Sequence, residues 1–558
     1  MSTASNYVQF ILDKHFGPTA SAVTRLMRIK GPVMMLEILR DCGNLCAVHV
    51  GRCLRSLLRH GVVRVRQRKP LKYELIYSSA FQIPRFPLFC QLVLHFYGKV
   101  AEDIITYLFL VGQATVSDLL RICISSDKSA SSDEERHKFV EVLGGSFDTL
   151  IKTNVLKVSM PVSESPDCNP PSEDNPTPET NRNVKEWPFQ RDTLCDAMHK
   201  FVSTGNVRSL KEAADSEPER KRARGTSSEE NAWKYVVSPN IATLEAMWRD
   251  RLIVQLAIER LGETCGDILS HLLCIATAAY RGTEITSPES GGVSRSELIR
   301  SLRKEPDFFD SHLSLLVEDE MGFLIHEGGL SGYMYTCPYK RVIKQMLAKH
   351  AEHVVQVLFQ ISGLRIFRLL LCYGPLTHEE VERRVLLPQS DFRRTLPKMI
   401  AAGFISTTEL SRTKEYTADT ILCLYSVNLS RVAALLIEWA QHAAWRVGLR
   451  AAYEFELKKR LIYHRYRVET LIKKHQAKLA QLKDTDETVM KPQIDESETN
   501  KEQRSHHQES LDALVSSITP SEQQQLRALT NKLAKLTVCE EDAHITWFVA
   551  DVYLRLNT

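Results

Sequence analysis

The sequence predicts a mainly α-helical protein with small β-hairpins, arranged as four winged-helix (helix-turn-helix) domains before a C-terminal coiled-coil hairpin. One repeated pattern supports this prediction: an apolar helical run reaches a Gly or Asn and then passes into a β-rich run. Gly and Asn are the residues that close a helix in the left-handed conformation. The four copies occupy residues 55–65, 148–158, 315–326 and 397–409, and their pivots are Gly61, Asn154, Gly322 and Gly403.

A helix-capping signal lies upstream of each pivot. In three copies a hydroxyl residue is followed three positions later by a carboxylate, so that each can accept a free amide of the first helical turn. The first copy has Gly31-Pro32 instead, a turn with a proline that suits a first helical turn. The three capping pairs are Thr115 with Asp118, Ser294 with Glu297, and Thr377 with Glu380.

Length and composition are those of a soluble intracellular protein with several domains. The 558 residues are too many for one core and suggest three to five domains. A net charge of +4 is close to neutral, so nucleic-acid contacts must come from local basic patches. Thirteen scattered cysteines suggest free thiols in a reducing compartment. The amino terminus lacks a signal-peptide layout, and the longest nearly uncharged helical run, Ile268–Tyr280, is too short to span a bilayer.

The repeats and the composition shifts between them set the expected domain boundaries. The second wing is expected to be completed, after a long excursion, by a strand within Trp233–Val237. Pro397 should kink or shorten the third helix of the fourth copy. The expected parts are winged helices at 1–82, 83–160 (with 232–238), 239–350 and 360–429, a disordered acidic, Pro-rich linker at 161–231, a coiled-coil hairpin at 430–538 and a terminal amphipathic helix at 539–558.

The C-terminal part follows a different pattern. A capping box at Thr519 and Glu522 restarts a helix after a polar break, and a heptad seam of leucines follows it, which indicates an antiparallel helical hairpin. The apolar face of the last twenty residues must dock on another surface. The seam consists of Leu526, Leu529, Leu533 and Leu536.

The candidate nucleic-acid site is a basic cluster in the first copy. Its helical arginines lie opposite Leu54 and Leu57, and its wing arginines alternate with Val63 and Val65, as in a recognition helix with a basic wing. The alternatives are a solvated surface or a docking face for an acidic protein, and charge patterns do not choose between them. The cluster comprises Arg52, Arg55, Arg59, Arg64, Arg66, Arg68, Lys69 and Lys72.

The other copies are less basic at the equivalent position. In the third copy, acidic residues would repel phosphate: Glu318, Asp319 and Glu320. The fourth has a weaker basic set: Arg383, Arg384, Arg393, Arg394 and Lys398. Four winged helices of which at most one is strongly basic suggest a scaffold that mostly binds proteins.

Neither a catalytic residue nor a bound metal or cofactor is expected. Enzyme signatures such as GxxxxGK[ST], GxGxxG and HExxH are absent from the sequence. The residue types of one group suit zinc, but paired Cys-x-x-Cys knuckles are missing and buried apolar cysteine is the commoner outcome. That group is Cys42, Cys46, His49, Cys53 and His60. A basic run resembles a nuclear localisation signal: Arg220, Lys221, Arg222 and Arg224.

The order of these parts resembles the large winged-helix subunit of RNA polymerase III (its third subunit, in the RPC family), which is related to the alpha chain of general transcription factor IIE. The likeness covers essentially the whole chain. It rests on LDKHFG (12–17), WRDRLIV (248–254), RIFRL (365–369) and LYSVN (424–428).

This resemblance implies a non-catalytic subunit of DNA-dependent RNA polymerase III in the nucleus, with a cytosolic role in foreign-DNA sensing linked to animal members. Its implied partners are a smaller winged-helix subunit and an acidic-tailed subunit. This heterotrimeric initiation subcomplex would sit on the clamp of the largest subunit, which would hold the catalytic magnesium. The trio would assist promoter opening at tRNA, 5S rRNA and other small RNA genes, with some affinity for single-stranded DNA. The alternative is a free DNA-binding transcription factor of the IIE-alpha type.

Overall fold

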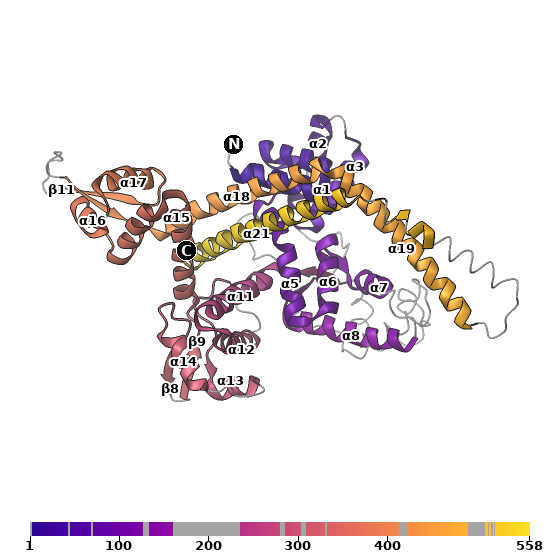
Figure 1. Ribbon diagram of the computed structural model, residues 1–558, viewed down its shortest axis with the longest axis horizontal. Helices are drawn as coiled ribbons and strands as arrows, with labels where there is room; N and C mark the ends of the chain where they lie inside the picture. The colour runs from indigo at the N-terminus through magenta and orange to yellow at the C-terminus, as the bar shows by residue number, and fades with distance from the viewer. Residues whose placement is uncertain are drawn as a thin grey trace. The chain divides into compact units, whose positions relative to one another are not determined.

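The computed structural model is mainly helical, with four small antiparallel sheets (Figure 1). It forms two compact units, 1–435 with 549–558, and 436–548, which are described separately below. The residues that the structure describes are 3–42, 45–68, 71–126, 133–159, 235–279, 285–302, 308–329, 332–411, 421–488, 508–511, 513–514, 517 and 519–557. The linker and basic run expected at 161–231 lie outside this set.

The first helical group begins with a long helix that breaks at Gly17. Gly17 has a φ of 83° immediately before Pro18, and the chain then resumes as a second helical segment. Pro32 does not start a helix, because it precedes strand β1, and Glu37 instead accepts the Met34 amide at 3.0 Å. The elements are α1 (Thr3–Lys30), β1 (Val33–Met34), α2 (Met35–Asp41), α3 (Ala47–Arg59), β2 (Val63–Arg68), β3 (Leu71–Leu75), α4 (Tyr77–Gln82) and η1 (Ile83–Arg85).

The second group is completed by a strand far along the chain. Val237 pairs with both Ala114 and Val158, so β6 is the central strand of its sheet. The strand expected within Trp233–Val237 is therefore present, shifted to Val236–Pro239. The elements are α5 (Phe86–Tyr97), α6 (Lys99–Val111), β4 (Ala114–Thr115), α7 (Val116–Ser126), α8 (Asp133–Lys152), β5 (Leu156–Ser159) and β6 (Val236–Pro239).

The third group contains two long helices that pack side by side, α11 and α12. Two strands form an antiparallel hairpin after the third pivot, with Ile325 opposite Thr336 and Gly329 opposite Gly332. The elements are α11 (Ile241–Leu261), α12 (Glu263–Ala279), β7 (Val293–Ser294), α13 (Arg295–Ser301), α14 (Phe309–Glu318), β8 (Ile325–Gly329) and β9 (Gly332–Thr336).

The fourth group shows that Pro397 does not shorten its helix. Helix α17 continues through Pro397 to Ala401 and is 13 residues long, as α3 is. The exposed side of the helix accommodates the proline ring. The elements are α15 (Tyr339–Tyr373), β10 (Leu376–Thr377), α16 (His378–Val385), α17 (Gln389–Ala401), β11 (Ser406–Ser411) and β12 (Ile421–Ser426).

Helix α15 is also the one helix in the described part of the chain that is long and apolar enough to span a membrane, so Ile268–Tyr280 is not the longest apolar run. It breaks at Gln360, which has a φ of 59°. Leu347 and Phe367 are buried within the protein, whereas Val357, Leu358 and Ile361 beside the break are exposed. Packing within the described part of the chain therefore accounts for only part of the apolar composition of α15.

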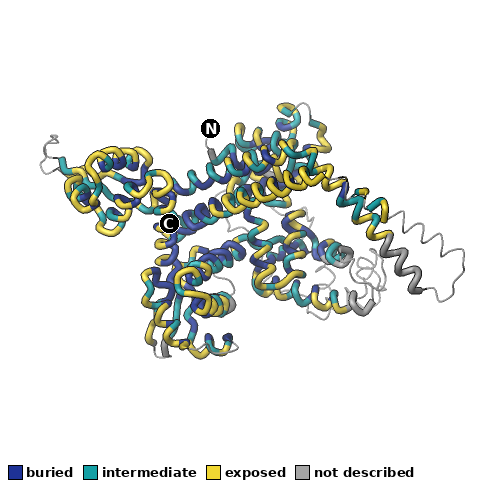
Figure 2. Tube along the Cα trace, viewed as in Figure 1, coloured by how far each residue is buried: buried dark blue, intermediate teal, exposed yellow. Residues whose placement is uncertain are grey.

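The same strand order recurs in all four sheets: the first strand pairs with the third, and the third with the second. All four pivots have positive φ, from 57° at Asn154 to 84° at Gly403. The three predicted capping pairs form, for example between the Ser294 hydroxyl and the Glu297 carboxylate at 2.9 Å. Buried residues line the inside of each helical group and exposed residues its outside (Figure 2).

In the second unit, the helical segments 454–458 and 525–532 run antiparallel. The Glu454 carboxylate lies 3.6 Å from the Lys532 amine, whereas Lys458, one turn later, donates to Gln525 at 2.8 Å. The helices are α18 (Leu429–Leu457), α19 (Lys459–Thr488) and α21 (Pro520–Asn557). A separate terminal helix from residue 539 was expected, but α21 is continuous because neither Pro nor Gly interrupts residues 521–557.

Candidate nucleic-acid interface

Helix α3 presents arginines on the face opposite its buried side. Val50, Leu54 and Leu57 are buried, with Val50 and Leu57 fully inaccessible. The exposed side carries Arg52, Arg55 and Arg59, as predicted. Spacings of three and four residues place them on one side of the helix. Phosphate groups could therefore approach α3 along this row.

Two of the wing arginines are partly neutralised by Glu74, a residue outside the predicted basic cluster. Arg64 donates to the Glu74 carboxylate at 3.0 Å, and Arg66 reaches its other oxygen at 3.4 Å. Glu74 stands directly opposite Arg64 on strand β3. Both guanidinium groups stay exposed, so the ion pairs are surface pairs and contribute little to stability. The single negative charge of Glu74 lowers the net positive charge of the wing by one.

The remaining wing residues depart from the expected alternation of buried valines and exposed basic side chains. Val65 was expected to pack with Val63, but it is 40% exposed. The pairing of β2 with β3 shifts register immediately after it. Lys72 is half-buried in strand β3. The Arg68 backbone belongs to β2, but its side chain lies outside the described residues, as does all of Lys69.

One side of α3 faces the second helical group rather than solvent. A groove of about 880 Å³ there is lined by His15, His49, Arg52, Cys53 and His60, among other residues. His60 is held at the end of α3, since its Nδ1 lies 2.9 Å from the Ser56 carbonyl and its Nε2 lies 3.2 Å from the Phe109 carbonyl. Arg52 thus borders the groove, while Arg55 and Arg59 lie outside its lining.

The predicted weaker set in the fourth group is also exposed. Arg383 and Arg384 lie on α16, and Arg393, Arg394 and Lys398 on α17, all accessible to solvent. Arg384 stacks over the Tyr373 ring at 4.9 Å. The third group differs, because Glu320 is exposed and Asp319 is held by Arg260 at 2.8 Å. The predicted contrast between a basic surface in the fourth group and an acidic one in the third is therefore present.

The zinc candidates do not form a metal site in the part of the chain that the structure describes. No cluster of three or more His, Cys, Asp or Glu side chains there could hold a metal ion. Both ring nitrogens of His60 lie within hydrogen-bonding distance of carbonyl oxygens. Cys46 is exposed, whereas burial raises the pKa of the Cys53 thiol to about 11. The cysteines of this group are therefore neither uniformly buried nor clustered around a common metal-binding position.

A thiol-labelling experiment tests this arrangement. We expect iodoacetamide at pH 8 to alkylate Cys46 well before Cys53, because a thiol with a pKa near 11 is almost entirely protonated at that pH. Added zinc should change neither rate, as read by mass spectrometry of the peptides. Zinc protection of Cys46, Cys53 and Cys42 together would contradict the absence of a site.

A buried ionic cluster that no local sequence signal revealed joins distant parts of the first unit. The Glu245 side chain on α11 is 4% exposed and lies 3.6 Å from Arg85 and 3.1 Å from Arg555. Gln82 adds a hydrogen bond to the same carboxylate at 3.4 Å. Arg85 also lies 5.6 Å from the centre of the Trp248 ring. The end of the chain is docked here, as its apolar face predicted.

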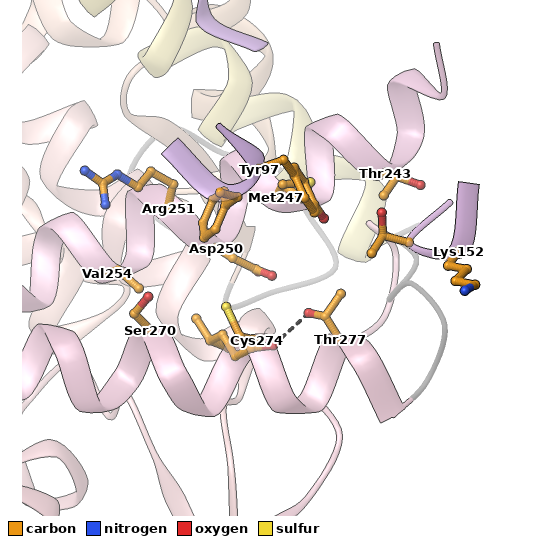
Figure 3. Close-up of a pocket in the computed structure, with 13 residues that line it drawn as sticks. Tyr97, Lys152, Thr243, Met247, Asp250, Arg251, Val254, Ser270, Cys274 and Thr277 are labelled. Carbon is orange, nitrogen blue, oxygen red and sulfur yellow. Dashed lines mark hydrogen bonds between the residues drawn. The ribbon is translucent and has the colours of Figure 1, made fainter. Parts of the chain in front are cut away.

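An apolar cavity of about 380 Å³ lies between the second and third groups (Figure 3). Asp250 from α11 faces Ser270 and Cys274 from α12 across it. Asp250 accepts two hydrogen bonds from Arg249, at 3.0 and 2.9 Å. Burial raises the pKa of the Asp250 carboxyl, and Arg249 opposes that rise. Asp250 is thus held by Arg249 at the wall of the cavity.

This fold, with its exposed basic helices, defines a winged-helix protein. The family model "POLR3C, C-terminal winged-helix domain" matches residues 351–427, which include the fourth sheet and helices α16 and α17.

Curated relatives extend this likeness to nearly the whole chain. A protein of Bos taurus named DNA-directed RNA polymerase III subunit RPC3 is 24% identical over 98% of this chain and 97% of its own length. Its namesake of Homo sapiens is 25% identical, over 88% of this chain and 92% of its own. That of Danio rerio is 24% identical over 90% and 94%. The resemblance predicted from the sequence is therefore confirmed.

Proposed function

We propose that the chain is an accessory, non-catalytic subunit of nuclear RNA polymerase III. The observation that carries the proposal is the similarity to relatives named as subunits of this polymerase over 98% of the chain. A free transcription factor of the IIE-alpha type is not favoured, because these relatives are named as polymerase subunits. The catalytic site would belong to other subunits.

The proposed partners are those that the resemblance implies: a smaller winged-helix subunit, an acidic-tailed subunit and the clamp of the largest subunit. The subcomplex would assist promoter opening at tRNA, 5S rRNA and other small RNA genes. The repeated strand order supports four winged helices as its building blocks, since each small sheet follows a similar set of helices. Four such modules offer several separate docking faces.

Affinity purification tests the assembly. We expect a tagged chain purified from nuclear extract in 0.5 M salt to retain the large polymerase subunits, because protein interfaces with apolar cores resist salt whereas phosphate contacts do not. Mass spectrometry of the eluate identifies the subunits. Elution of the chain alone would contradict a stable subunit and restore the free-factor alternative.

Within this function we propose that the α3 row and the wing contact DNA phosphates. Arg55 and Arg59 carry the proposal best, because they are exposed on α3 and lie outside the groove that Arg52 borders. The wing contributes less, since Glu74 already binds Arg64 and Arg66.

Replacing Arg55 and Arg59 by Glu should weaken DNA binding by the full chain. Each lost phosphate contact should lower the slope of log affinity against log salt by about 0.9. Glu74→Gln should have the opposite effect, because it frees two wing guanidinium groups. Fluorescence anisotropy over a salt series measures both, with Arg393→Glu and Arg394→Glu as matched reversals on α17. An unchanged slope in Arg55→Glu/Arg59→Glu would show that this face does not contact DNA phosphates.

A further inference from the structure

The apolar cavity between the second and third groups has the size and the lining of a small-molecule site (Figure 3). Its volume of about 380 Å³ falls within the range of about 300–1,000 Å³ that is typical of ligand pockets. Its walls come from the ends of α5 and α8 and from α11 and α12. Side chains such as Phe96, Met247 and Leu273 make most of its surface apolar. Burial of an apolar molecule here is therefore favourable.

The charged residues of the lining differ in where they point. The Lys152 amine is held at 2.6 Å by Asp148, and Arg251 extends away from the cavity toward His95, 3.5 Å from its ring nitrogen. Asp250, in contrast, points into the cavity toward α12 (Figure 3). Among the described residues that line the cavity, Asp250 therefore sets the charge that a ligand meets, and an anionic ligand would be repelled by it.

Two of the lining hydroxyl groups are already bonded to their neighbours. Thr277 donates to the Leu273 carbonyl at 2.7 Å, and Thr243 accepts from the Asn240 amide at 2.9 Å. The remaining polar groups are few beside the apolar surface, as is usual in ligand pockets, where a small number of polar groups fixes the orientation of the ligand. Asp250 is placed to be the orienting group.

The Asp250 carboxylate keeps the capacity to accept a further hydrogen bond. Its side chain is 14% exposed, and both hydrogen bonds from Arg249 end on its Oδ1 atom. A carboxylate has about four acceptor positions, so a place remains even when the Tyr339 hydroxyl also donates to it. The Arg249 guanidinium group already balances the charge of Asp250, which reduces the advantage of a second cation. The complement of Asp250 is thus an uncharged hydrogen-bond donor.

We propose that this cavity binds a small, uncharged amphipathic molecule, an alcohol or phenol with an apolar body, whose hydroxyl group donates to Asp250. The site goes beyond the proposed subunit role and beyond the α3 row, because its ligand is neither a protein nor a nucleic acid. The α5 and α8 walls belong to the second group, and the α11 and α12 walls to the third. The bound molecule would therefore contact both groups at once.

Isothermal titration calorimetry of the full chain with 4-phenylbutan-1-ol tests the site, and the methyl ether of this alcohol is the matched probe. The ether keeps the ring, the carbon chain and the oxygen atom but lacks the donor. We expect the alcohol to bind saturably with a dissociation constant below about 1 mM, as a good fragment of this size does. The ether should bind at least tenfold more weakly, and 4-phenylbutyrate should not bind, because its carboxylate would face that of Asp250.

Cys274→Phe should abolish binding of the alcohol, because the added ring would occupy the cavity. Cys274 is exposed and lines the α12 wall, whereas Cys372, also exposed, lies on α15 outside the lining, so Cys372→Phe is the matched control and should bind as the wild type does. Asp250 is probed through the ligand rather than by mutation, because its removal would take a carboxylate from the buried Arg249 side chain.

A second measurement locates the bound alcohol without any mutation. The alcohol should slow alkylation of Cys274 by iodoacetamide and leave that of Cys46, which lies outside the lining, unchanged, as read by mass spectrometry of the peptides. Equal affinities for the alcohol and the ether would overturn the proposal, as would wild-type binding by Cys274→Phe or unprotected Cys274. Co-purification with the polymerase is read separately, so failure of this site leaves the subunit role standing.

Discussion

Replacing Glu245 by Gln should cost the first unit about 3–5 kcal/mol of unfolding free energy, the range observed when one partner of a buried ion pair is removed. The carboxylate is 4% exposed and lies within 3.6 Å of two guanidinium groups. Without that charge, Arg85 would remain 3% exposed and would lose the carboxylate that does most to offset the desolvation of its guanidinium group. Urea unfolding followed by tryptophan fluorescence measures the loss.

Hydrogen exchange locates the effect. Amides of residues 549–557 should exchange faster in Glu245→Gln, because Arg555 loses its contact with α11. The matched control is Glu259→Gln on the same helix, whose side chain is exposed and accepts a hydrogen bond from Gln255 at 3.3 Å. That change should stay within about 0.5 kcal/mol. Equal stability of the two variants would show that the cluster does not hold the chain end.

Gly112→Ala should destabilise the contact between the first two helical groups by about 2 kcal/mol or more. Gly112 has a φ of 86°, where an added Cβ costs about 1–2 kcal/mol. That Cβ would also lie 2.5 Å from the Arg59 carbonyl oxygen, so the backbone at the end of α3 must move. The shift should break the contact between His60 and the Phe109 carbonyl. Faster hydrogen exchange at residues 56–61 is the expected sign.

Gly98→Ala introduces backbone strain without a steric clash, so it separates the two effects expected in Gly112→Ala. Gly98 has a similar φ of 84°, but an added Cβ would meet nothing within 4 Å. Both variants should lose stability, and only Gly112→Ala should expose the end of α3. If the two variants behave alike in hydrogen exchange, the close approach of Gly112 to Arg59 has no energetic consequence.

The features that the sequence predicted well are those that local chemistry determines. Pivots such as Asn154 and Gly403 require a positive φ, and few residues other than Gly and Asn accept it. Capping pairs act over three residues, so their spacing alone identifies them. The strand within Val236–Pro239 was predictable because β5 otherwise lacked a partner after the second pivot.

The features that the sequence did not predict depend on residues far apart in the chain. Arg52 borders a groove only because α5 and α6 pack beside α3, and Glu245 meets an arginine 310 residues away. Glu74 was visible opposite the wing arginines, but its pairing with two of them depends on the hairpin register.

The most direct measurement of the central proposal is transcription by polymerase III from which this chain has been depleted. On a promoter-containing tRNA template, depletion should abolish RNA synthesis and added wild-type chain should restore it. On a tailed template that needs no promoter opening, the depleted enzyme should remain active, because catalysis belongs to other subunits. Failure of the chain to restore promoter-dependent synthesis, or equal loss on both templates, would contradict the role of an accessory initiation subunit.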